Sequence, residues 1–239
     1  MSELQDWAVR QWDASKGRTV GVYAGALGYS YNRDQLKKKN IAEPKCWADL
    51  IKPEFKDEVQ VANPNSSGTS YNMLATIVQI MGEDKAFDYL KKLHRNVNQY
   101  TKSGAAPARA AATGETMVGI VFQHDALYQV LGGAPLKIVS PCEGTGYEIG
   151  SMSIVKGAKN MDNAKKWYDW ALSTEAQAIG SQNKVSYQVP SNKNAPVPAQ
   201  SPKLTEVKLI NYDFVKYGSS AERKRLLEKW DKEVSTLPK

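Results

Sequence analysis

The fold is decided by the stretch VQVANPNSSGTS, residues 59–70, which joins a short apolar run to the start of a helical pattern. Residues 59–62 are typical of a buried strand, and from Gly68 apolar residues recur at three- and four-residue steps until Gly82 ends the helix. A strand, a polar loop and a helix in succession form the repeating unit of a parallel α/β sheet. The stretch therefore predicts an α/β fold.

The same rhythm continues on the C-terminal side of this unit. The pattern predicts a helix over 84–94, a strand over 97–101, a helix over 107–113, and strands over 117–122 and 136–139. The segment 117–122 is continuously apolar and contains β-branched residues, so it predicts a central strand buried on both faces. Two further helices are predicted over 162–173 and from about 221 to 234.

Strand-like stretches flank this region on both sides. A stretch with three glycines, residues 19–32, precedes it, and the Gly-rich stretch 143–150 follows it. We expect residues 44–140 to form one complete α/β lobe. Residues 1–43 and 141–239 are expected to form a second lobe, together with the strands that cross between the lobes.

Composition places the chain among folded globular proteins. Of its 239 residues, 41% are hydrophobic and 24% are charged, which argues against coiled-coil and disordered classes. The formal net charge of +7 is compatible with an anionic ligand, a nucleic acid or an acidic surface. No run of about 18 apolar residues is present, so no membrane span is expected. No basic stretch followed by an apolar segment opens the chain, so no signal peptide is expected in it.

The sharpest local signal is the polar turn that contains Ser66, Ser67, Gly68 and Thr69. It lies between a predicted strand and a predicted helix, where free backbone N–H groups and the helix dipole favour an anion. Small hydroxyl residues add donors without blocking the approach of a ligand. The alternative is an ordinary capping turn, which Ser66 or Ser67 would supply in any case.

A second loop of the same kind contains Thr101, Lys102 and Ser103, again after a strand and before a helix. Lys102 adds positive charge to an anion held there, although a solvated lysine in a capping turn is the simpler alternative. Ligands of open α/β sheets bind outside the carboxyl ends of the strands, so the two loops are expected to converge on one crevice.

His124 and Asp125 follow the predicted central strand and are expected at the same edge of the sheet. The imidazole can donate to an oxyanion, and the carboxylate can accept hydrogen bonds from hydroxyl groups. The alternative is a capping aspartate beside an ordinary histidine. Glu148, in the Gly-rich stretch, can likewise accept from sugar hydroxyls or pair with a surface lysine.

Enzyme chemistry finds little support in the sequence. The chain lacks a Gly-x-Ser-x-Gly elbow and a Gly-x-x-x-x-Gly-Lys phosphate loop, and its two histidines do not have metal-ligand spacing. No catalytic residue, metal or cofactor is therefore expected. The basic stretches 37–39 and 223–225 are too short for a nucleic-acid interface. Cys46 and Cys142 are too few for a disulfide framework, and their state stays open.

The order of several motifs resembles a known family. These are PKCWADL over 44–50, VANP over 61–64, the Ser67-Gly68-Thr69 turn, the stretch 143–150 and AKKWYDW over 164–170. Together they resemble the extracytoplasmic solute-binding proteins of ABC importers, in the branch with iron(III)-binding and sugar-phosphate-binding proteins. The resemblance extends from about residue 7 to residue 234.

The resemblance implies a role for each candidate residue. In relatives, the loop that matches Ser67-Gly68-Thr69 holds an anion, either beside ferric iron or as the phosphate of an organic ligand. In iron-binding relatives, two adjacent tyrosines follow the strand that matches 117–122. This chain has His124 and Asp125 there, so the sugar-phosphate branch is the nearer one, with His124, Asp125 and Glu148 as polar groups for the sugar.

The resemblance also implies a periplasmic-binding-protein-like fold of type II, whose two lobes close on a small anionic solute in the cleft between them. Such a protein is periplasmic and works with the membrane subunits of an importer. Relatives begin with a further stretch, so the discontinuous first lobe is expected to be truncated at its N-terminal side. An incomplete lobe exposes apolar surface, so we expect self-association into a homo-oligomer.

Two other functions stay open at this point. The first is a ferric-binding protein of the same fold that uses Tyr29, Tyr31, Tyr100 or Tyr147. The second is an interaction protein or fragment that has kept the fold and only self-associates.

Overall fold

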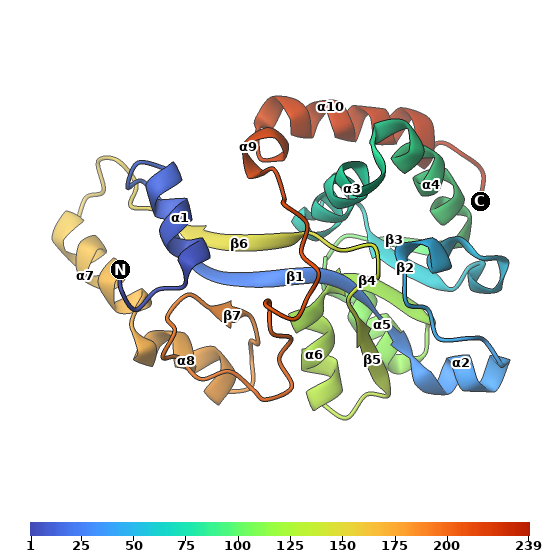
Figure 1. The fold of residues 1–239 in the computed structure, drawn as a ribbon, viewed down its shortest axis with the longest axis horizontal. Coiled ribbons are helices and arrows are strands. Elements are labelled where there is room, and N and C mark those ends of the chain that lie inside the picture. The colour runs from blue at the N-terminus through green and yellow to red at the C-terminus, as the bar shows by residue number, and fades with distance from the viewer. The chain divides into compact units, whose positions relative to one another are not determined.

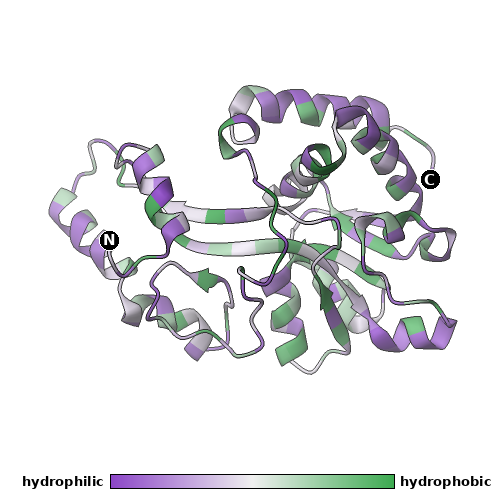
Figure 2. Ribbon diagram, in the orientation of Figure 1, coloured by the Kyte–Doolittle hydropathy of each residue, from purple (hydrophilic) through white to green (hydrophobic).

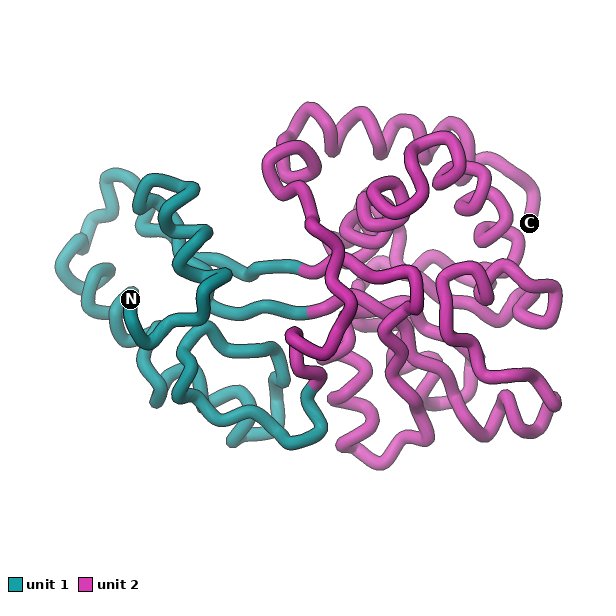
Figure 3. The backbone as a smooth tube through the Cα atoms, in the orientation of Figure 1, with its two compact units in different colours: residues 1–25, 148–201 teal, residues 26–147, 202–239 magenta.

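The computed structural model describes residues 1–239, which divide into two compact units (Figure 3). The smaller unit contains residues 1–25 and 148–201, and the larger unit contains residues 26–147 and 202–239. Both units combine helices and strands, so the predicted α/β class is confirmed. None of the helices has the length and apolar character needed to cross a membrane.

The sheet of the larger unit has the strand order β3-β2-β4-β1-β5 (Figure 1). The strands are β1 Val20–Asn32, β2 Val59–Ala62, β3 Val97–Thr101, β4 Val118–Phe122 and β5 Leu136–Val139. β2 is parallel to β3 and to β4, whereas β1 is antiparallel to β4 and to β5. The parallel arrangement predicted from residue 59 onward is therefore confirmed for β2, β3 and β4. For β1 the sequence predicts a strand without a direction, and the structure shows it to be antiparallel to its neighbours β4 and β5. A hydrophobic pattern gives the burial of a strand but not its direction.

Helices pack on this sheet and bury its apolar faces. They are α2 Arg33–Lys39, α3 Gly68–Met81, α4 Glu83–Asn96, α5 Ala106–Thr113 and α6 Gln123–Leu131. The predicted helices α3, α4 and α5 are confirmed, and α6 is an addition. In Figure 2, α2 is mostly hydrophilic, with few apolar residues, and its Leu36 is buried. β4 is buried along its whole length at the centre of the sheet, as its apolar run predicts.

The C-terminal helices belong to the larger unit, which differs from the expected division of the chain. α9 Phe214–Tyr217 and α10 Ser220–Trp230 lead into the π-helical turn η3 Asp231–Ser235. Leu226, Trp230 and Val234 lie in the same hydrophobic cluster as the buried side chains of α3 and α4. The apolar spacing of the last helix predicts that it is buried, but not against which core. Residues 26–43 join the larger unit for a similar reason, because Leu27, Tyr29 and Tyr31 pack into this cluster.

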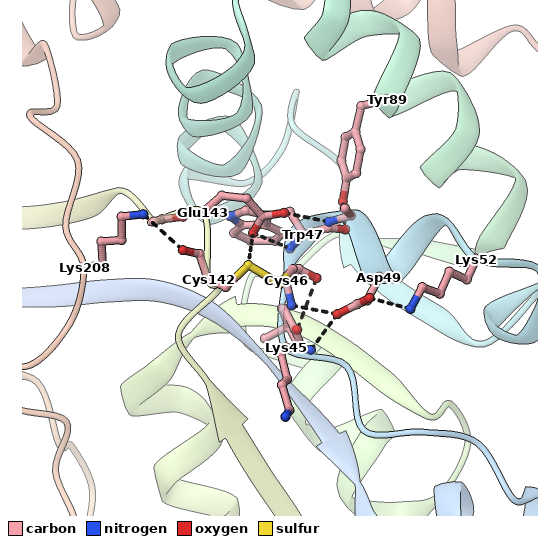
Figure 4. The surroundings of a disulfide bond; sticks show 12 residues. Lys45, Cys46, Trp47, Asp49, Lys52, Tyr89, Cys142, Glu143 and Lys208 are labelled. Atoms are coloured by element: carbon pink, nitrogen blue, oxygen red, sulfur yellow. Dashed lines mark hydrogen bonds and ion pairs between the residues drawn. A yellow bond between two sulfur atoms is a disulfide. The ribbon is translucent and has the colours of Figure 1, made fainter.

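A disulfide bond joins Cys46 to Cys142, two residues that are 96 positions apart in the sequence (Figure 4). Cys46 caps the short 3₁₀ helix η1 Trp47–Ile51, which is followed by a second one, η2 Pro53–Phe55. Beside the disulfide, the Glu143 carboxylate accepts from the backbone N–H groups of Trp47 at 2.8 Å and Ala48 at 2.9 Å. The disulfide and the carboxylate thus fasten residues 142 and 143 to η1. Sequence separation alone could not reveal this pairing.

The smaller unit has a much smaller core. It contains α1 Asp6–Ala14, most of β6 Tyr147–Met152, α7 Met161–Ala171, α8 Thr174–Gln182 and β7 Val189–Pro190. Its hydrophobic cluster has three buried members, Leu4, Ala8 and Val20, with partly buried side chains around them. On α7, Trp167 is 59% exposed and Trp170 is 45% exposed. Predicted helix 162–173 is confirmed, and α8 is an addition.

Candidate functional site

The loop between β2 and α3 presents backbone donors that the protein does not use. Ser67 caps α3, and its Oγ accepts a hydrogen bond from the Ser70 N–H at 3.4 Å. The backbone N–H groups of Gly68 and Thr69 begin the helix and form no hydrogen bond with another protein group. The positive end of the helix dipole lies at the same place. The turn therefore both caps the helix and offers an anion-binding position.

The loop after β3 packs directly against this turn. Ser66 Oγ donates a hydrogen bond to Lys102 O at 3.3 Å. A Cβ atom added to Gly104 would lie 2.2 Å from Thr69 Oγ1 and 3.0 Å from Ser67 Oγ. Only a glycine permits this approach without a shift of the neighbouring side chain. The structure thus brings together the two loops that the sequence places at neighbouring strand ends.

The three polar residues of the second loop differ in how far their side chains are exposed and free to contact a ligand. Thr101 is buried, and its Oγ1 donates to Ser103 O at 2.9 Å, so its hydroxyl proton is used inside the loop. Lys102 and Ser103 are exposed, and Lys102 forms no salt bridge. Thr101 therefore uses its hydroxyl proton inside the loop. Lys102 is solvated, as the simpler alternative expects, and its role in holding an anion stays a prediction.

His124 lies in the first turn of α6, immediately after β4. Its ring stacks on Phe122, with the two centroids 5.5 Å apart, and its Nδ1 is buried without a hydrogen-bond partner. Burial lowers the pKa of His124 from 6.5 to about 4. The imidazole is therefore neutral at pH 7, with one nitrogen that protein atoms leave unsatisfied. Such a group is costly in a fold and is a candidate for ligand contact.

Asp125 is the second ionisable group of this turn. Burial raises its pKa from 3.8 to about 6, and the positive charge of Arg109 on α5 opposes part of that rise. The distance from His124 Nε2 to Asp125 Oδ1 is 3.9 Å, too long for a hydrogen bond. Because His124 is neutral at pH 7, the two side chains do not form a charged pair there. The part of both residues in ligand binding stays a prediction.

The three strand ends share one edge of the sheet. β2 is parallel to β3 on one side and to β4 on the other, so their carboxyl ends point the same way. The helices α3, α5 and α6 begin beyond these ends. Ser66 to Thr69, Thr101 to Ser103, and His124 with Asp125 consequently belong to one edge of the larger unit. Glu148 lies in β6 and in the smaller unit, and its part in the site stays a prediction.

Sequence reasoning missed two residues near this edge. Arg109 influences the charge of Asp125 from a neighbouring helix, and only the packing of α5 beside α6 shows this. Ser70, in the first turn of α3, has a buried Oγ without a partner. Its place in the polar turn was visible in the sequence, but its burial depends on how α3 packs.

In α/β proteins, the loops at the carboxyl ends of parallel strands are a typical position for a small ligand. A profile of the bacterial extracellular solute-binding protein family matches residues 4–217, so the chain belongs to this family. The family assigned from the sequence motifs is therefore confirmed.

Solved structures agree with this assignment. The chain is 52% identical to the periplasmic binding protein AfuA from Actinobacillus pleuropneumoniae, with a TM-score of 0.87, 92% of this chain covered and 69% of that one. The AfuA structure contains exogenous fructose-6-phosphate. The chain is 38% identical to the periplasmic binding protein P5PA, with a TM-score of 0.90, 98% of this chain covered and 74% of that one. The predicted periplasmic-binding-protein-like fold is thus confirmed.

A sequence relative shows how much of a longer protein the chain matches. The chain is 52% identical over 225 residues to an uncharacterized protein of Haemophilus influenzae. The match covers 92% of this chain and 64% of the relative, so the chain spans slightly under two thirds of that protein.

Proposed function

We propose that this chain is the solute-binding component of an ABC importer and captures a small phosphorylated organic anion such as a hexose phosphate. The observation that carries this proposal is the pair of unused N–H groups at Gly68 and Thr69, flanked by the hydroxyls of Ser66, Ser67 and Thr69. The fructose-6-phosphate bound to AfuA, which is 52% identical, supports the same ligand class.

Each group has a role in this proposal that fits its chemistry. The turn at Gly68 and Thr69 receives the phosphate oxygens, and Lys102 adds positive charge at its margin. His124 and Asp125 contact the hydroxyl groups of the sugar, because a neutral imidazole can donate and accept and a carboxylate accepts. Glu148 supplies a further acceptor for the sugar hydroxyls.

The disulfide supports an extracytoplasmic location. Cys46 and Cys142 are bonded, and disulfides persist in the oxidising compartments outside the cytoplasm. The relatives AfuA and P5PA are periplasmic binding proteins. A periplasmic chain of this family delivers its solute to the membrane subunits of an importer, which we propose as its partner.

The ferric-binding alternative is less well supported by the tyrosines of the larger unit. A tyrosine that binds ferric iron does so as a phenolate, and burial opposes its formation by raising the pKa values of Tyr29, Tyr31 and Tyr100. The Tyr100 hydroxyl is also engaged with His94 Nδ1 at 3.0 Å. No pair of tyrosines follows β4, where His124 and Asp125 stand.

Calorimetric titration with glucose 6-phosphate tests the proposal. Replacing Ser67 and Thr69 by alanine removes two hydroxyl donors, and we expect binding to weaken by at least about 100-fold. The matched control replaces Ser173 and Ser219, which cap α8 and α10, by alanine. This control loses two capping hydroxyls elsewhere and should bind like the unmodified chain. Equal affinity of the Ser67→Ala, Thr69→Ala variant would overturn the proposed phosphate position.

Self-association is a second candidate property, favoured by the exposed tryptophans of α7. The rings of Trp167 and Trp170 lie 6.5 Å apart on one exposed patch. Adjacent exposed aromatic side chains are uncommon on monomers and typical of association surfaces. We expect light scattering at micromolar concentration to show a dimer or larger species that the Trp167→Lys, Trp170→Lys variant loses. A stable monomer of the unmodified chain would dismiss this candidate.

A further inference from the structure

A basic pocket lies in the larger unit at the sheet edge opposite the candidate site. It has a volume of about 590 Å³, and its walls come from the η1–η2 region, the end of α4 and the C-terminal segment. The lining contains Lys56, which precedes β2, and Asn96, which precedes β3. The pocket therefore lies at the amino ends of the strands whose carboxyl ends hold the candidate site.

Four cations line this pocket, and no carboxylate side chain does. They are Lys56, Lys92, Arg95 and Lys239. None of the four forms a salt bridge, although salt bridges pair other lysines of the same unit, such as Lys52 with Asp49. Four cationic side chains around one concavity, with no carboxylate side chain among them, create a positive potential that attracts anions.

The rest of the lining is largely apolar. Ile51, Pro53, Leu237 and Pro238 contribute apolar surface between the cations. A ligand that satisfies both features carries a negative group for the cations and an apolar group for this surface. A simple inorganic anion would use the first feature only.

Hydrogen bonds hold the walls of the pocket in place. Asn96 Nδ2 donates to Leu50 O and to Lys52 O, both at 2.8 Å, and so ties α4 to η1. His94 Nε2 lies 3.0 Å from Leu237 O, a carbonyl that can only accept, so this nitrogen carries the proton. Lys239 Nζ donates to Asn98 O at 3.1 Å. The C-terminal segment is thereby fastened beside α4, as Figure 1 shows.

We propose that this pocket is a second ligand site, which binds a soluble organic phosphate or similar anion that carries an apolar group. The site is independent of the proposed phosphate position at Gly68 and Thr69. Lys92 and Arg95 bind the negative group, and the surface formed by Ile51, Pro53, Leu237 and Pro238 binds the apolar group.

Calorimetric titration of the full chain with naphthyl phosphate tests this second site. We expect the Lys92→Ala, Arg95→Ala variant to bind about tenfold more weakly than the unmodified chain. The matched control, Lys37→Ala with Lys38→Ala, removes two exposed helical lysines without salt bridges and should change the affinity less than about twofold. The Ser67→Ala, Thr69→Ala variant should keep this binding, which separates failure of the second site from failure of the proposed function.

Protection of lysine side chains from acetylation can be measured on the unmodified chain and needs no variant. Naphthyl phosphate should protect Lys56, Lys92 and Lys239 from acetylation and leave Lys37 reactive. Inorganic phosphate should protect them at least about tenfold less well at equal concentration, because it lacks an apolar group. The proposal would be overturned if Lys92→Ala, Arg95→Ala and the control Lys37→Ala, Lys38→Ala lost affinity for naphthyl phosphate equally. It would also be overturned if only the Ser67→Ala, Thr69→Ala variant lost this binding. Binding to anionic phosphatidylglycerol vesicles without binding to naphthyl phosphate would also overturn it.

Discussion

The two halves of the candidate site obtain their chemistry in different ways. At the end of β2, Gly68 and Thr69 offer N–H groups that carry no formal charge and do not titrate. At the end of β4, His124 and Asp125 are ionisable groups, and burial lowers the pKa of His124 to about 4 and raises that of Asp125 to about 6. The first half can bind an anion at any pH at which the chain is folded. The second half depends on pH, and its burial has a cost in stability.

The largest expected effect concerns two glycines of the first half. Gly104→Ala places a Cβ against Thr69 Oγ1, so we expect loss of glucose 6-phosphate binding by at least about 100-fold and a loss of roughly 1–3 kcal/mol in the free energy of unfolding. In Gly68→Ala the new Cβ meets no protein atom within 4 Å, so the variant should keep its stability while the methyl group crowds the ligand. Titration and thermal unfolding of both variants distinguish these outcomes. Unchanged affinity of Gly104→Ala for glucose 6-phosphate would show that the contact between the two loops does not contribute to binding.

The next largest effect is the pH-dependent stability that we expect from the buried carboxyl group of Asp125. Its folded pKa of about 6 lies above its ordinary 3.8, so the folded state holds the proton more tightly. The cost of its charge is fully present above pH 6 and absent below about pH 4. We therefore expect Asp125→Asn to stabilise the chain at pH 7 by on the order of 1–3 kcal/mol, with the gain vanishing near pH 4. Chemical unfolding at both pH values checks this, and a pH-independent change would contradict the burial of the carboxyl group.

His124 should lower the stability of the folded chain as the pH falls, whereas Asp125 lowers it as the pH rises. Its folded pKa of about 4 lies below its ordinary 6.5, so the unfolded chain takes up a proton first as the pH falls. Stability is therefore lost between pH 6.5 and about 4 in the unmodified chain. His124→Gln lacks this loss, so its unfolding temperature should rise relative to that of the unmodified chain as the pH decreases over this range. His94, whose pKa burial also lowers, is present in both chains and cancels. A constant difference between the two chains would refute the assignment.

The smallest effect concerns Thr101. Its hydroxyl donates to Ser103 O inside the loop, so Thr101→Val should cost about 1 kcal/mol of stability and leave the affinity for glucose 6-phosphate within about threefold. Denaturant unfolding and titration measure the two quantities. A large loss of affinity with intact stability would return Thr101 to the ligand-binding residues.

The sequence predicts most local structure of the larger unit because each element carries its own pattern. Ser67 and Gly82 mark the two ends of α3, and the apolar run of β4 marks its burial. The antiparallel direction of β1, the packing of α10 and the Cys46–Cys142 bond depend on contacts between distant segments, which local patterns do not contain. For the candidate site, the sequence predicts where the strands end and which polar residues follow them. The burial that changes the pKa values of His124 and Asp125 was not, because it arises from side chains packed around them.

In the proposed complex, phosphate oxygens occupy the turn at Gly68 and Thr69. A crystal structure of the chain with glucose 6-phosphate tests it most directly. We expect phosphate oxygens within hydrogen-bonding distance, about 3 Å, of both backbone nitrogens. A phosphate group bound elsewhere, with these two nitrogens contacting only water, would contradict it.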